Sequence, residues 1–457
     1  MRLLLVDLIF AVWSLAALWQ PALASALLLW VDIMAPLELA YSTGAQPLST
    51  WALGVMLVSF AVNVAFRGFR PRITYFFWMW LLFFGWACVC TWVSPFPQST
   101  DGLIRILKYQ APLLLISMSA RTIKDARFLA YLLAVSLGVW GAKIGAGCLL
   151  HGMNNYMHIE GTQMGDNNFL SAGVVSILPI LLYAATDYSG RYKLAVRFAW
   201  GIGLLLCLAT VIFSNSRGAA LGVLGNVVIY LALISKKKLR DIALVALVGG
   251  AVLMVLPQSF WNRMNTLQDV GTDKAESSAR ERLLLVKSTF RAVNDYPVFG
   301  VGPYSWVVVS NYYTGLQTSM QPHNIWLKCS VELGYPGLLI FISLILGTII
   351  RLLRVRNQAY QAGQIRTGKL ALALASCQIG YIISLTFLSN YDLEFQWAWL
   401  AVGNAFVGIW KTNRSALQTR ALKKGRTRSE PAEPDSTPEP PALGDSNQYQ
   451  SDKGNPA

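Results

Sequence analysis

The chain has 457 residues, of which 54% are hydrophobic and 13% charged, and its formal net charge is +15. Repeated apolar runs long enough to cross about 30 Å of hydrocarbon predict an all-α polytopic membrane protein rather than a set of soluble domains. The lysines and arginines lie mainly in short loops between these runs, so the positive charge predicts membrane topology and no nucleic acid partner.

The apolar runs give the predicted elements in chain order. Residues 3–39 are interrupted by Pro21 and Pro36 and contribute one or two crossings. One crossing gives about 12 transmembrane helices with both termini inside, which we prefer, and two would place the N-terminus outside. The further spans are predicted near 50–66, 75–93, 103–119, 128–150, 169–186, 198–213, 218–234, 242–258, 324–350, 370–389 and 397–410.

The connecting loops alternate in charge and so predict which side each faces. Basic loops, such as 67–72, 121–127 and 236–240, are predicted to be cytoplasmic. The opposite, outer side holds a long loop at 259–322, which we expect to be partly helical in 279–295. Its basic residues do not overturn the assignment, because long translocated loops are largely exempt from the charge rule.

These boundaries predict two parts of the chain. Residues 1–413 form a transmembrane domain that includes the 259–322 loop. Residues 414–457 begin basic and become rich in Pro, Glu and Ser without apolar periodicity, which predicts a disordered cytoplasmic tail.

Two residues stand out at the predicted outer ends of spans. Arg217 follows Ser214-Asn215-Ser216 and precedes small residues, which let a phosphate approach the backbone and the guanidinium together. His323 follows Pro322, which suits a first helical turn. A helix dipole and nearby cations disfavour imidazolium, so His323 is predicted to be neutral and able to accept a proton. The alternatives are a headgroup-level anchor for Arg217 and a polar cap for His323.

Other candidates lie on the outer side or within the predicted bilayer, where a cation is costly unless it pairs, snorkels or faces a wet cavity. The alternative for Lys328 is an ion pair with Glu332, four residues on, and the alternative for Arg105 and Lys108 is snorkelling. The candidate substrate-binding residues are Arg105, Lys108, Lys143, Arg280, Lys328 and Asn324.

Four segments follow one another in a characteristic order. They are Ser214-Asn215-Ser216-Arg217-Gly218, Ser277-Ser278-Ala279-Arg280-Glu281-Arg282-Leu283, Pro297-Val298-Phe299-Gly300-Val301-Gly302-Pro303, and His323-Asn324 with Glu332-Leu333-Gly334-Tyr335-Pro336-Gly337. Together they resemble the O-antigen ligase and polymerase superfamily, over roughly residues 160–345 by motif. The start of a span at Asp166-Asn167-Asn168-Phe169 is also similar to O-glycosylation ligases.

The resemblance implies a bacterial inner-membrane glycosyltransferase whose active site faces the periplasm. It would move a glycan from undecaprenyl diphosphate to lipid A core oligosaccharide, or act as an O-antigen polymerase or a protein O-glycosylation ligase. It further implies that Arg217 and Arg282 hold the diphosphate and that His323 activates the acceptor. Glu281 and Val286 depart from the family pattern, so Arg280 and Arg282 both remain candidates, with Arg282 first.

Displacement at the anomeric carbon predicts inversion. The outer loops carry no Asp-x-Asp or Glu-x-Asp pair, and Asp392-Leu393-Glu394 alone is too little for a metal site, so we expect an enzyme without metal or cofactor. A polysaccharide transporter is the alternative from another class. An inverted repeat would favour it, and the sequence shows none.

Overall fold

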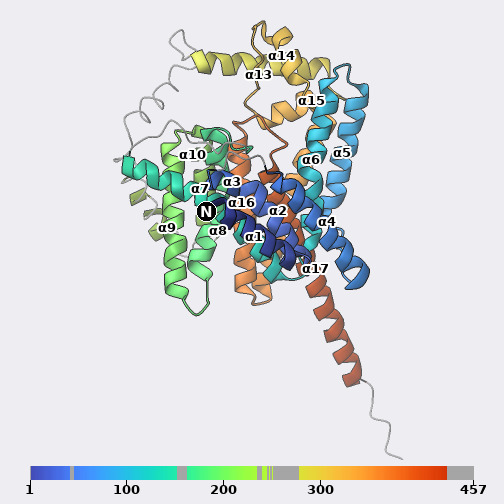
Figure 1. Ribbon diagram of the computed structural model, residues 1–457, viewed down its shortest axis with the longest axis vertical. Helices are drawn as coiled ribbons and strands as arrows, with labels where there is room; N and C mark the ends of the chain where they lie inside the picture. The colour runs from blue at the N-terminus through green and yellow to red at the C-terminus, as the bar shows by residue number, and fades with distance from the viewer. Residues whose placement is uncertain are drawn as a thin grey trace, which may run out of the picture. The chain divides into compact units, whose positions relative to one another are not determined.

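The computed structural model describes residues 2–41, 46–151, 162–233, 239–243, 246–247, 250 and 277–429. For residues 277–280 and 416–429 it describes the backbone alone. The described residues form helices and no strands, which confirms the all-α prediction (Figure 1). Residues up to Lys411 form one compact unit, and a second unit begins at Thr412.

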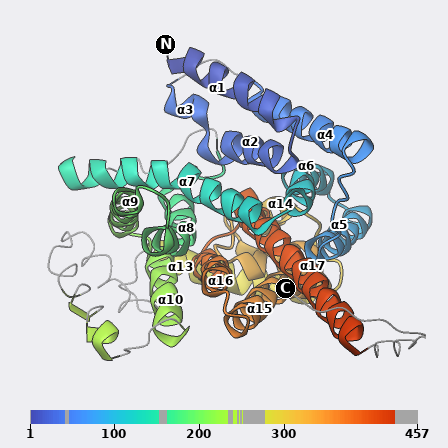
Figure 2. The same ribbon diagram turned by 90° about the horizontal axis from the view of Figure 1, so that it is seen from below.

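The N-terminal stretch folds into α1 (Arg2–Ala17), α2 (Pro21–Met34) and α3 (Pro36–Leu39). Pro21 and Pro36 therefore begin helices, where a missing backbone N–H costs nothing. Helix α2 packs against α1, α4 (Leu48–Phe66) and α7 (Ile123–His151), as Figure 2 shows.

Most of the other helices overlap the predicted spans, whereas α14 was not predicted and α15 and α17 extend beyond the predicted ends. They are α5 (Tyr75–Val93), α6 (Gln98–Ser119), α8 (Asn167–Asp187), α9 (Lys193–Phe213), α10 (Arg217–Leu233), α13 (Ser277–Asp295), α14 (Trp306–Thr314), α15 (Ile325–Gln361), α16 (Ile365–Leu385) and α17 (Glu394–Ser429). The helix expected in 279–295 is present as α13. The predicted span 242–258 falls mostly outside the described residues.

Among the described residues, seven helices are long and apolar enough to cross a membrane, namely α4, α5, α7, α8, α9, α15 and α16, while α2 and α10 are apolar but shorter. This confirms a multi-pass helical membrane protein. The count of 12 spans, the side that each loop faces and the division at residue 413 stay predictions. Helix α17 continues to Ser429, into the segment predicted as a tail, and 430–457 lie outside the described residues.

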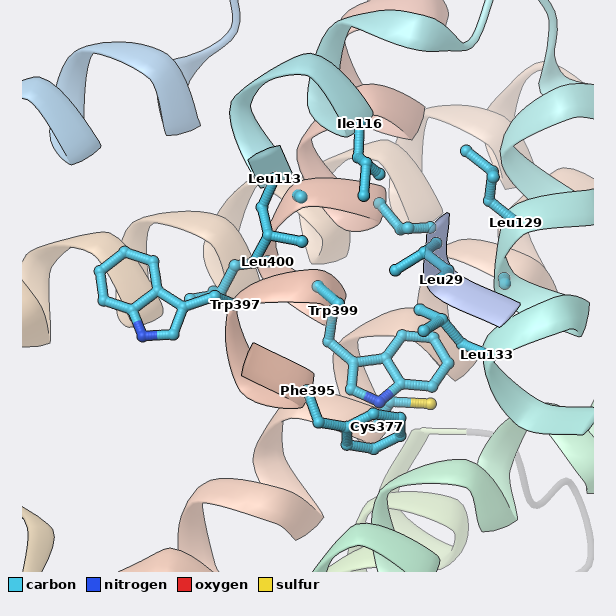
Figure 3. Packing of buried hydrophobic residues seen from close by; sticks show 14 of the residues in the cluster. Leu29, Leu113, Ile116, Leu129, Leu133, Cys377, Phe395, Trp397, Trp399 and Leu400 are labelled. Atoms are coloured by element: carbon cyan, nitrogen blue, oxygen red, sulfur yellow. The ribbon is translucent and has the colours of Figure 1, made fainter. Parts of the chain in front are cut away.

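Helices α8 and α16 lie at the centre of the bundle. Of the residues in an apolar 18-residue stretch of each helix, 72% are buried in α8 and 78% in α16, against 22% in α9. Small residues allow this close packing: a side chain at Gly222 of α10 would meet the Gly380 carbonyl of α16. Trp399 of α17 lies among Leu133, Phe395 and Cys377 (Figure 3) and donates from Nε1 to Ser176 Oγ at 3.0 Å.

Helix α15 is broken near its start, and the break anchors the segment 297–302. Pro336 lacks the N–H that would bond to the Glu332 carbonyl, and Gly302 N–H donates there instead, at 2.9 Å. Gly334 has a positive φ of 68°, and a Cβ there would collide with the Val298 carbonyl. Only glycine allows this close backbone approach.

Candidate functional site

The entry to α15 places His323. Asn324 is the N-cap of this helix, and its side chain accepts from the N–H groups of Trp326 and Leu327 at 2.9 and 3.0 Å. Pro322 therefore precedes the helix, and the prediction that it would lie in the first helical turn is wrong. His323 has a φ of 45°, which is uncommon for a residue other than glycine, and its N–H donates to Ser389 Oγ at 2.8 Å.

The charge state of His323 is set by its neighbours. The pKa of the imidazole is lowered from its ordinary value, first because the surrounding protein partly desolvates the ring, although His323 is solvent-exposed, and second because the charge of Arg282 disfavours a proton on it. Asp166 opposes the shift. His323 and Arg282, 41 positions apart in the sequence, are thus brought together, and the predicted neutral base agrees with the direction of the shift.

Arg282 lies on α13 with an exposed side chain, available to a ligand. Arg280 is on the same helix, and its side chain is outside the described residues. Only Arg282 can therefore be related to His323 here, and the choice between the two arginines at a substrate remains a prediction.

Arg217 is the first residue of α10, at the end of the helix that packs on α16. A Cβ on the adjacent Gly218 would lie 3.0 Å from the Ser384 carbonyl. The same end of α16 is joined to the entry of α15, because Trp326 Nε1 donates to Thr386 Oγ1 at 3.1 Å and Ser389 holds the His323 amide. The segment 384–389 therefore contacts the surroundings of both Arg217 and His323.

Helix α8 begins at the same place. Asp166 caps it by accepting from the N–H groups of Asn168 and Phe169, and Asn167 Nδ2 donates to the Ser214 carbonyl at 2.8 Å. The N-termini of α8, α10 and α15 thus face one region. Helix N-termini favour anions because their N–H groups and dipoles point outward, so this region suits an anionic ligand.

Three of the other candidate substrate-binding cations, Arg105, Lys108 and Lys143, differ in their neighbours. Lys143 is exposed and donates to the Tyr41 hydroxyl at 3.0 Å, and Lys108 is exposed with its ammonium 5.8 Å from the Tyr109 ring centre. Arg105 forms an ion pair with Asp392 at 3.0 Å. Their contacts with a substrate remain predictions.

Lys328 is buried and forms the i, i+4 pair with Glu332, Nζ to Oε1 3.6 Å, that its spacing predicted as the alternative reading. The side-chain oxygen of Asn324 is used by the helix cap. Substrate binding by Lys328 and by the amide of Asn324 stays a prediction.

Sequence reasoning missed a buried polar network beside this entry. Tyr304 donates to Asp392 Oδ2 at 2.9 Å, and Tyr391 donates to Glu332 Oε2 at 2.9 Å. Nothing local in the sequence marks either tyrosine. The neighbouring acid Glu394 forms a side-chain hydrogen bond with Asp32, so the two carboxyl groups of Asp392-Leu393-Glu394 have separate partners.

An apolar groove of about 560 Å³ runs between α10 and α16. Its α10 residues recur at helical spacing and begin one turn after Arg217, so one end of the groove lies beside the polar region. The groove is lined by Leu221, Leu224, Gly225, Val228 and Ile229 of α10 and by Ile379 and Ile383 of α16, with Thr386 and Phe387 just beyond the end of α16.

The fold and the site define a multi-pass α-helical membrane protein with a basic, histidine-containing site where several helices begin. Residues 202–342 match the family model described as O-Antigen ligase, which supports the resemblance of this chain to the O-antigen ligase superfamily of membrane ligases and polymerases. This segment contains Arg217, Arg282 and His323. Residues 1–189 match a second family model, described as a family of unknown function. Comparison with curated proteins gives no match.

Proposed function

We propose that the protein transfers an O-antigen glycan from undecaprenyl diphosphate to a hydroxyl group of lipid A core oligosaccharide, on the periplasmic side of the bacterial inner membrane. The observation that carries the proposal is the pair of His323, with its lowered pKa, and Arg282 inside the segment matched to the O-antigen ligase family. The proposed topology has about 12 spans, with 259–322 in the periplasm and 414–457 as a cytoplasmic tail.

The proposed reaction uses the site residues in two roles. His323 takes the proton of the acceptor hydroxyl, and the hydroxyl oxygen attacks the anomeric carbon of the donor. The bond from that carbon to the diphosphate oxygen breaks, and the electron pair leaves with the diphosphate. Arg217 and Arg282, with Arg280 as a further candidate, stabilise the developing negative charge. Attack from the face opposite the leaving group inverts the anomeric carbon.

The apolar groove supports a lipid-linked donor. It begins one helical turn from Arg217 and is lined almost entirely by aliphatic and aromatic side chains. A polyisoprenyl chain lying in it would bring its diphosphate to the helix N-termini, where anions are favoured. The lipid and the charged headgroup of one substrate would therefore have adjoining sites.

Purified protein is expected to attach glycan from undecaprenyl diphosphate to lipid A core, with product that carries the lipid A mass and an inverted linkage. Activity should persist in excess chelator, because arginines carry the charge stabilisation. Mass spectrometry gives the mass of the products with and without chelator, and NMR of the anomeric centre gives the configuration of the new linkage. Longer glycan still on undecaprenyl diphosphate would instead indicate a polymerase, glycosylated protein would indicate a protein ligase, and loss of activity in chelator would contradict the metal-independent reaction.

The proposed base makes a prediction for the pH profile. The pKa of His323 lies below its ordinary value of 6.5. The neutral form is lost as pH falls through this lowered pKa, so kcat/KM should fall only at pH values below 6.5. Arg282→Gln removes a repelling cation and should move the acid limb to higher pH, whereas Asp166→Asn should move it to lower pH. Asparagine keeps the helix cap. An acid limb that neither variant moves would contradict the assignment.

A further inference from the structure

Lys328 lies one helical turn after Asn324, and its side chain is enclosed, with 1% of the residue exposed. Its ammonium donates to Gln321 Oε1 at 2.6 Å, faces Glu332 Oε1 at 3.6 Å and lies 4.9 Å from the Tyr304 ring centre. An ammonium group has three N–H donors, and these three groups surround it. Because the ammonium is enclosed by the protein, Lys328 does not itself contact a substrate.

Glu332 is fully buried and holds Lys328 from the next turn of α15. Its second oxygen accepts from the Tyr391 hydroxyl, and its backbone carbonyl accepts from Gly302 N–H. The acid is thereby fixed to the helix break and to the segment before α17. Burying two charges costs free energy, and well-packed apolar residues often replace such a pair without loss of stability. The ion pair of Lys328 and Glu332 is therefore weak evidence for a role in stability, and a functional role is considered instead.

The link from Lys328 to Gln321 supplies such a role. Gln321 is two residues before His323, and it is half-buried. The loop is fixed at two points, by Lys328 on the Gln321 side chain and by Ser389 on the His323 N–H. The left-handed backbone of His323 is unfavourable for a histidine and persists only where surrounding contacts hold it.

We propose that Lys328 and Glu332 are positioning residues that hold the 321–323 loop so that the His323 imidazole faces the region of Arg282. The proposal rests on the function proposed above, because its effect is read through His323 as the base. The pair also connects this loop to Asp392 and Arg105, since Tyr304 packs on Lys328 and donates to Asp392, the ion-pair partner of Arg105.

The test is the double variant Lys328→Met with Glu332→Gln, which removes both charges and leaves an acceptor for Tyr391. We expect normal membrane insertion, an unchanged thermal midpoint and an unchanged KM for the donor, with kcat lowered roughly 10- to 100-fold by misplacement of the base. Lys328→Arg, which keeps the charge, should retain more of kcat than Lys328→Met. A double variant with wild-type kcat would overturn the proposal.

Gln321→Leu tests the same link without disturbing the buried charges, so the proposal does not depend on the double variant folding. It should lower kcat by a similar factor, and its combination with Lys328→Met should lose no more than either change alone. Wild-type kcat in a folded Gln321→Leu protein, or additive losses, would show that Lys328 has only a structural role.

A matched control is the ion pair of Lys369 with Asp187, Nζ to Oδ2 3.0 Å, between α16 and α8 at the ends away from this site. Lys369→Met with Asp187→Asn should leave kcat unchanged. His323→Ala in the same assay distinguishes failure of the proposed base from failure of the proposed positioning role: if this variant stays active, the proposed base is wrong. If it is inactive while Gln321→Leu and the Lys328 variants are fully active, only the positioning role is wrong.

Discussion

His323→Ala is expected to lower kcat roughly 10²- to 10⁴-fold, the range by which a positioned general base accelerates proton transfer. The binding of the lipid-linked donor should change little, because the arginines that we propose to hold the diphosphate remain. The measurement is single-turnover transfer of labelled glycan by purified protein.

Two variants make the His323 result specific. His323→Asn removes the base but tolerates the left-handed backbone, so it should be as inactive as the alanine variant. His151→Ala, an exposed histidine at the end of α7, should transfer at the wild-type rate. Wild-type transfer by a correctly inserted His323→Ala protein would exclude His323 as the base.

Arg217→Lys is expected to lower kcat about 10²-fold, and Arg217→Ala at least as much, because each removes the planar pair of donors that we propose to bind the leaving diphosphate. Lysine keeps the charge but not the fork, so the comparison separates bidentate recognition from charge alone. Steady-state rates at saturating donor are the measurement.

The control for Arg217 is Arg354→Lys, at an exposed position near the far end of α15, which should not change the rate. Full activity of Arg217→Lys would show that charge alone suffices at this position. Equal activity of Arg217→Ala and the wild type would remove Arg217 from the site.

Much of the helical framework followed from local patterns. Apolar runs predicted α5 at 75–93, where the structure has Tyr75–Val93, because a membrane-crossing helix must be apolar along its whole length. The i, i+4 spacing of Lys328 and Glu332 gave their pairing as the alternative to a substrate contact for a similar reason, since residues four apart share one face of a helix.

The candidate site was predicted in part. The residue types of Arg217, Arg282 and His323 and their order along the chain were visible in the sequence, and the structure relates Arg282 to His323. The cap formed by Asn324 was missed: the predicted span began at residue 324, whereas helix α15 begins at Ile325 and Asn324 is its N-cap.

By itself, the sequence determined the class of protein, the approximate place of most long helices and the cations worth testing, because hydropathy and helical periodicity are properties of neighbouring residues. The tertiary structure alone decided that Arg105 pairs with Asp392, 287 positions away, and that Tyr304 and Tyr391 join the network around Lys328. Such partners are chosen by how helices pack and by where a broken helix leaves carbonyls to be bonded, and neither is written in the spacing of residues along the chain.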